Sequence, residues 1–137
     1  MNEAKPADGP GARTGGPAGV AAMAAAAQLI AARKVNGTAV VNRAGERIGA
    51  IYDVMIEKRS GKVAFAIMSF GGFLGLGEKY YPLPWSMLNY DQEHGGYIVD
   101  LDRNRLEGAP AYDVGATPDW TDALFVRGIN TYYGIGM

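Results

Sequence analysis

The 137-residue sequence contains no cysteine. Disulfide bonds, thiolate metal ligands and cysteine nucleophiles are therefore excluded. An excess of charge of one sign is also missing, because 13 lysines and arginines face 14 aspartates and glutamates, for a formal net charge of -1. Nucleic-acid-binding proteins usually carry a basic excess that neutralises phosphates. The balance therefore argues against a nucleic-acid partner and against a polybasic patch for a membrane surface.

The sequence also lacks a hydrophobic run of the roughly 20 residues that a membrane-spanning helix needs. The nearest candidate, residues 20–32, is weakly apolar because eight of its thirteen residues are alanine. As a signal peptide it is poorly placed, since its long leader contains Glu3 and Asp8 and has no compact basic region. We therefore predict no transmembrane segment and a cytoplasmic protein, with an export signal as the alternative.

Apolar residues and glycine are abundant. Hydrophobic residues make up 48% of the chain, which is enough for a packed core and argues against wholesale disorder. The 20 glycines and seven prolines predict many turns and few long helices. The length suits one ordinary domain and is too short for two comfortable ones.

Composition divides the chain into three segments. Residues 1–28 combine a glycine- and proline-rich stretch with an alanine-rich one, and we expect them to form a disordered or partly helical tail. Residues 29–112 have the sequence pattern of short strands separated by turns. Residues 113–137 form a C-terminal extension, in which Thr117 as N-cap and Pro118 at the first helical position predict a short helix.

Local patterns in the middle segment predict short strands. In residues 48–57, the side chains of Tyr52, Val54 and Ile56 share one parity, so they are expected on one face of a half-buried strand. Residues 63–70 are almost continuously apolar, which is typical of a strand in the centre of a sheet.

The second half of this segment continues in the same way. Residues 78–85 predict a strand that ends at two prolines, and residues 88–90 and 97–99 predict a hairpin. Asp102 predicts the cap of one helical turn after the hairpin. Five or six short strands in antiparallel order favour a small barrel or a tightly rolled sheet, because rolling removes most of the unpaired backbone at the edges.

Many separate segments, in the same order, closely resemble the PRC-barrel family. They span about residues 29–112, roughly 60% of the chain if the core is one typical domain. The matching runs are VNGTAV (35–40), GERIGAIYDVMI (45–56), SGKVAFAIMSFGGFLGLGEKY (60–80), PLPW (82–85) and LEGAP (106–110).

The resemblance implies a mainly β fold, a small six-stranded antiparallel barrel that serves protein contacts, with a short helix after the last strand. The family includes the cytoplasmic part of the H subunit of purple-bacterial photosynthetic reaction centres and the C-terminal domain of a ribosome-maturation factor. This chain is similar to the stand-alone bacterial members, and it differs from the H subunit in having no transmembrane helix. The members of the family share no catalytic motif. We therefore expect no catalytic residue, cofactor or metal, and we predict that the protein is not an enzyme.

An apolar glycine-rich loop at residues 71–77 is the best candidate for a contact surface. Loops usually face water, yet Phe73, Leu74 and Leu76 are large and apolar. They form either an exposed patch for self-association or a partner, or a plug for one end of the barrel. Three further aromatic residues extend the candidate surface, unless they belong to the core: Tyr80, Tyr81 and Trp85.

Two motifs that suggest chemistry have simpler explanations. Gly72 and Gly77 have the spacing of a phosphate-binding loop, but Glu78 stands in place of its lysine and would repel phosphate. His94 is the single histidine, and its turn brings no obvious further metal ligands, so an exposed, solvated side chain is expected.

Three functions remain open at this point. The first is a non-enzymatic adaptor that forms a homodimer or binds a protein partner. The second, implied by the family, is an accessory subunit or modulator of membrane electron transport, at a membrane-associated complex. The third is a small-molecule binder at the barrel mouth, where Tyr80, Tyr81 and Trp85 would line the ligand site.

Overall fold

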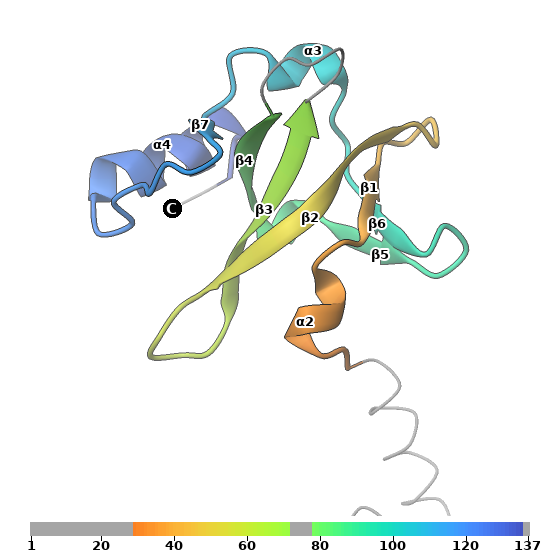
Figure 1. The fold of residues 1–137 in the computed structure, drawn as a ribbon, viewed down its shortest axis with the longest axis horizontal. Helices are drawn as coiled ribbons and strands as arrows, with labels where there is room; N and C mark the ends of the chain where they lie inside the picture. The colour runs from red at the N-terminus through yellow and green to blue at the C-terminus, as the bar shows by residue number, and fades with distance from the viewer. Residues whose placement is uncertain (1–28, 72–77, 136–137) are drawn as a thin grey trace, which may run out of the picture. The chain divides into compact units, whose positions relative to one another are not determined.

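The computed structural model describes residues 29–71 and 78–135 (Figure 1). It divides into two units after Ala31, and all the helices and strands described here belong to the second unit, Ala32–Met137. The predicted tail, residues 1–28, lies outside the described residues. Among the described residues, no helix has both the length and the apolar character needed to cross a membrane.

Short strands dominate the second unit, and the helices are few and short. In chain order its elements are α2 (Ala32–Val35), β1 (Ala39–Val41), β2 (Arg47–Ile56), β3 (Val63–Gly71), β4 (Glu78–Pro84), the 3-10 helix η3 (Trp85–Met87), β5 (Asn89–Asp91), β6 (Gly96–Ile98), α3 (Arg103–Leu106), β7 (Tyr112–Asp113) and α4 (Ala123–Tyr132).

The strands form one seven-stranded sheet in the order β5-β6-β1-β2-β3-β4-β7. The prediction of a mainly β fold is confirmed, but the prediction of six antiparallel strands closed into a barrel is wrong. The sheet is mixed, because β1 pairs parallel with β6, and within the described residues β5 and β7 are its two unjoined ends. A seventh strand arises where the two residues of β7 pair with the outer edge of β4.

The parallel pair follows from the way the chain returns to β1. The edge of β1 opposite β2 is filled by β6, which follows β3, β4 and β5 in the chain (Figure 1). Val40 lies opposite Tyr97 in this pair. A sequence pattern of short strands and turns does not encode such a non-local pairing, because it specifies each strand but not its neighbours.

The prediction for β2 is corrected by irregularities in its pairing. Ile51 pairs with Met68 and Asp53 with Ile67, so Tyr52 between them is the extra residue of a β-bulge. A bulge shifts the alternation of side chains by one residue. Tyr52, Val54 and Ile56 therefore do not share one buried face: Tyr52 and Ile56 are exposed by about half, and Val54 packs against the core.

The core is built by β2, β3 and β4 together with side chains from the connections that follow. The central strand predicted at residues 63–70 is confirmed as β3, which lies between β2 and β4. The largest fully buried hydrophobic side chains come from β1, β2, β3, β4, α3, α4 and the connection after β6: Val40, Ile48, Ile51, Ile67, Met68, Leu83, Val99, Leu106 and Ile129.

The helical caps agree with the prediction at one site and correct it at another. Asp102 caps α3 as expected, because its side chain accepts a hydrogen bond of 2.9 Å from the backbone N–H of Arg105. The C-terminal helix exists, but it begins at Ala123 with Asp122 as N-cap and not at Thr117. Asp119 accounts for the delay, because its side chain binds the backbone N–H of Thr121 and holds the chain in a turn.

Candidate functional site

The structure separates the aromatic residues that the sequence grouped into one surface. Phe73, Leu74 and Leu76 lie outside the described residues. Tyr80 and Tyr81 are neighbours in β4 and therefore point to opposite faces of the sheet. Tyr81 lies edge-on to Phe70, with ring centroids 5.9 Å apart.

The ring of Trp85 contacts a different residue from those that Tyr80 and Tyr81 contact. It begins η3, and its ring lies edge-on to Tyr97 of β6, with centroids 5.4 Å apart. The described part of the chain thus distributes the predicted residues Tyr80, Tyr81 and Trp85 over three environments. Whether any of them forms a contact surface with the loop at residues 71–77 stays a prediction.

A different aromatic surface does form around Tyr80. Tyr52 of β2 stacks on the ring of Tyr80, with centroids 4.2 Å apart and planes inclined by 18°. The ring of Tyr112 in β7 lies edge-on to Tyr80 with centroids 5.5 Å apart, and the ring of Trp120 lies edge-on to Tyr112 at 6.4 Å. We call these four residues, Tyr52, Tyr80, Tyr112 and Trp120, the tyrosine face.

The local fold explains why these four side chains meet. The bulge in β2 makes Tyr52 the residue that reaches the ring of Tyr80. Tyr80 pairs directly with Tyr112 across β4 and β7, and beside this pair Lys79 and Asp113 form an ion pair of 3.7 Å. Tyr80 is buried beneath its neighbours, whereas 51% of Tyr52 remains exposed. The centre of the face is therefore covered, and Tyr52 is its solvent-exposed side chain.

The phenols of Tyr80 and Tyr112 are neutral near neutral pH. Burial raises the pKa of Tyr80 above 10.0, and the adjacent Tyr52 hydroxyl and the negative charge of Glu78 raise it further. The pKa of Tyr112 is raised mainly by burial and next by Tyr80. These hydroxyl groups therefore offer hydrogen bonds and apolar ring area, and they are poor general bases.

The single histidine lies at the opposite edge of the sheet, in the β5–β6 turn. His94 contacts the carboxylate of Asp91 through Nδ1. The hydrogen bond with Asp91 raises the pKa of His94, and the same bond lowers the pKa of Asp91. Within residues 29–71 and 78–135, no three acidic or histidine side chains gather as a metal site would require.

Two surface hollows are each lined in part by an arginine of α3, Arg103 in one and Arg105 in the other. One, of about 450 Å³, is lined by the start of β2, the end of β3 and Arg103. The other, of about 430 Å³, is lined by the β1–β2 turn and residues 100–102. Neither is lined by Tyr80, Tyr81 or Trp85, so the predicted ligand site at a barrel mouth gains no support from these hollows.

Arg103 is already engaged within the first hollow. Its guanidinium lies 3.1 Å from the carboxylate of Glu46, donates to the backbone carbonyl of Arg47 at 3.1 Å, and sits 5.8 Å above the ring of Phe70. These contacts join α3 to the start of β2 and the end of β3. We conclude that this arginine has a structural role.

Sequence reasoning missed the exposed member of the tyrosine face. Tyr52 carries no local signal, because its alternation with Val54 and Ile56 predicts a residue turned toward the core. Tyr112 was placed at the end of the domain and not in a strand. Only the pairing of β4 with β7 and the bulge in β2 bring these residues to Tyr80.

Comparison with known proteins identifies the family. The model of the PRC-barrel domain family matches residues 28–106. Among solved structures, a Pseudomonas aeruginosa protein named for 16S ribosomal RNA processing is similar at 19% identity with a TM-score of 0.36, and the alignment covers 57% of this chain and 48% of that chain. The chain thus spans about half the length of that protein. No curated protein matches the sequence.

Proposed function

The chain belongs to the PRC-barrel domain family, and from that premise we propose that it is a non-enzymatic, cytoplasmic protein-binding module. Its first partner is a second copy of itself, and the tyrosine face is the contact surface. The observation that carries the proposal is the position of Tyr52, a large ring that is half exposed and preorganised by stacking on a buried tyrosine.

Tyrosine and tryptophan are the side chains that protein interfaces favour. They supply large apolar area at low entropic cost and keep a polar group that tolerates water before association. Tyr52 fits this description, since its ring is held on one side by Tyr80 and open on the other. An anchor held in this way loses little side-chain freedom when a partner binds.

A second copy suits the chemistry of this surface. In a two-fold contact the same patch of both copies meets, so Tyr52 would face the ring cluster of its partner. The rim of the face carries both Lys79 and Asp113, so two copies would not repel each other through charge of a single sign. The neutral phenols of Tyr80 and Tyr112 add no charge of their own.

The test is the concentration dependence of the oligomeric state, followed by analytical ultracentrifugation. Tyr52→Asp should weaken dimerisation by about 2 kcal/mol or more, roughly 30-fold in Kd, because it replaces an interface ring by a charge. Tyr90→Asp is the matched control, since Tyr90 is 56% exposed and also contacts a neighbouring ring, that of Tyr97 in β6. It should leave Kd unchanged.

Two results would reject the proposal. A wild-type protein that stays monomeric at every accessible concentration would exclude the second copy as partner. An equal loss for both variants would exclude the tyrosine face. Leu74→Asp, measured in parallel, tests the predicted role of the loop at residues 71–77. A loss of dimerisation in this variant alone would show that the loop, and not the tyrosine face, forms the contact surface.

A further inference from the structure

The charges of the protein are strongly separated. Five cations occur on two short segments: Arg33 and Lys34 on α2, and Lys58, Arg59 and Lys62 around the β2–β3 turn. We call these five residues the basic end. A single carboxylate, Glu57, lies within the same two segments, whereas the remaining described residues carry six lysines and arginines against eleven aspartates and glutamates. A nearly neutral molecule therefore has one distinctly positive end.

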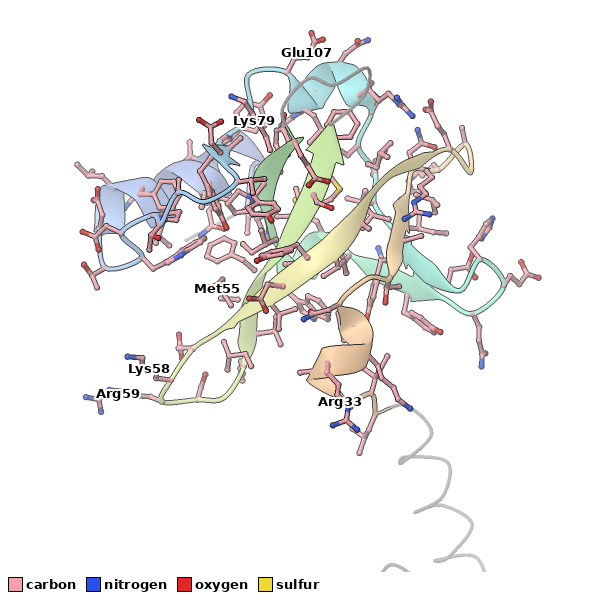
Figure 2. All side chains as sticks on the ribbon, viewed as in Figure 1. Arg33, Met55, Lys58, Arg59, Lys79 and Glu107 are labelled. Carbon is pink, nitrogen blue, oxygen red and sulfur yellow. The ribbon has the colours of Figure 1, made fainter. Side chains whose placement is uncertain are left out.

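The two segments project at the same end of the sheet. Figure 2 shows Lys58 and Arg59 at the β2–β3 turn and Arg33 on α2, apart from that turn but also in the lower part of the view, with Lys79 and Glu107 in the upper part. All five side chains of the basic end are exposed. Within the part of the chain that the structure describes, none of them forms an ion pair, so their charges face the solvent.

The β2–β3 turn presents its cations from a well-bonded backbone. The N–H of Glu57 donates to the carbonyl of Lys62, and the N–H of Gly61 donates to the carbonyl of Glu57, both at 2.8 Å. The N–H of Lys62 also donates to the Ser60 hydroxyl at 3.2 Å. These bonds fix the direction of the turn before any ligand arrives.

An exposed aliphatic residue accompanies the cations. Ile56 ends β2 immediately before the turn, and 49% of it is exposed. A branched apolar side chain beside several cations is the combination that peripheral membrane proteins use, because the cations meet anionic headgroups while the apolar group enters the boundary of the acyl chains.

We propose that the basic end binds the anionic phospholipid headgroups of a membrane surface. Two separate projections at one end of a sheet suit a planar surface, which both can reach at once. A single-stranded nucleic acid would favour aromatic side chains on which bases stack, and residues 32–35 and 57–62 contain none. This inference is independent of the tyrosine face and of self-association.

The experiment is co-sedimentation of the full chain with vesicles. Wild type should bind vesicles that mix phosphatidylcholine with phosphatidylglycerol, and it should not bind vesicles of phosphatidylcholine alone. The variant Lys58→Gln/Arg59→Gln/Lys62→Gln removes three cations of the basic end. Each cation near an anionic surface is worth roughly fivefold in partitioning, so the triple variant should bind on the order of 100-fold more weakly at low salt.

A control with the same net charge makes the experiment specific. Arg43→Gln/Arg47→Gln/Arg127→Gln also removes three exposed cations, but none of them belongs to the basic end or to the tyrosine face. This control should retain most of the vesicle binding, and both variants should melt close to wild type because all six residues are exposed.

The proposal is overturned by any of three results. Wild type fails to bind the anionic vesicles, or it binds phosphatidylcholine alone equally well, or the control loses as much binding as the basic-end variant. A fourth arm uses a short single-stranded oligonucleotide of equal charge. If the oligonucleotide displaces the protein from vesicles and its own binding needs the basic end, nucleic acid replaces lipid as the ligand.

Discussion

The two ends of the sheet use the same residue types in opposite ways. At the end that carries α3, the cations are engaged: Arg103 contacts Glu46 and Phe70, and Arg105 lies 5.1 Å above the ring of Tyr132. At the basic end, the described residues offer the cations no ion-pair partner. Arginine holds elements together at the first end and is left available at the second. Position relative to other elements, and not residue type, separates the two roles.

The largest effect on stability is expected from a substitution in the closely packed backbone near α3. A Cβ atom on Gly49, in the β2 segment nearest α3, would lie 2.5 Å from the backbone oxygen of Ser69. Gly49→Ala should therefore destabilise the protein by about 1–3 kcal/mol or more, because two strands must move apart. Gly128→Ala in α4 is the control, since apart from its chain neighbours and the backbone of its own helix no atom lies within 4 Å of the added methyl group. Alanine there should stabilise by about 0.5–1 kcal/mol.

Urea unfolding followed by circular dichroism measures both effects. A Gly49→Ala protein that unfolds at the same urea concentration as wild type would show that β2 and β3 do not approach as closely as described.

Arginine substitutions test the comparison directly. The guanidinium of Arg105 donates a hydrogen bond of 2.6 Å to the backbone carbonyl of Tyr132. The Tyr132 hydroxyl in turn donates a hydrogen bond of 2.5 Å to the backbone carbonyl of Arg105. Arg105→Ala should cost about 1–2 kcal/mol, because one charge-assisted hydrogen bond and the cation–π contacts with Tyr132 and Tyr133 are lost. Arg59→Ala at the basic end should change stability by less than about 0.5 kcal/mol.

The same unfolding assay gives the answer for this pair. Equal destabilisation by the two substitutions would contradict the distinction between an engaged and an available end. A smaller effect of Arg105→Lys than of Arg105→Ala would point to charge, and an equal effect would point to the planar guanidinium and its stacking.

The smallest expected effect concerns pH and the β5–β6 turn. Because Asp91 raises the pKa of His94, the contact contributes stability that is lost as the pH rises through the folded-state pKa of His94. Because the pKa of Asp91 is lowered, the contribution is also lost as the pH falls through its folded-state pKa. It is fully present only between the ordinary values of 3.8 and 6.5.

The substitution His94→Gln isolates this contribution. The difference in urea midpoint between wild type and variant should be larger near pH 5.5 than near pH 9, where histidine is neutral. A difference that does not change with pH would show that the contact with Asp91 has no ionic component in solution. Both side chains lie on the surface, so the change should be small and reduced by salt.

Local signals predicted much of the fold. The apolar run that became β3, the β5–β6 hairpin and the Asp102 cap each depend on residues close in sequence, and the structure contains all three. The parallel pairing of β1 with β6 and the addition of β7 to β4 depend on residues far apart in sequence. The family resemblance supplied the β-rich fold, but not this strand order.

The candidate surfaces were harder to predict. Tyr52 was expected to face inward, and only a bulge opposite β3 exposes it. The net charge of -1 argued against a basic surface, yet a net charge is a sum over the whole molecule. Arg33 and Lys58 are distant in sequence, and the fold places them at one end (Figure 2). Exposure and charge distribution are therefore properties of the fold that composition does not report.

The parallel pair of β1 and β6 also has a kinetic consequence. The β2–β3–β4 meander joins neighbours in sequence, so it can form with little loss of chain entropy. Val40 finds its partner Tyr97 only after the intervening chain has been arranged. During synthesis β1 must therefore wait for β6 to leave the ribosome, and this late closure is expected to limit the folding rate.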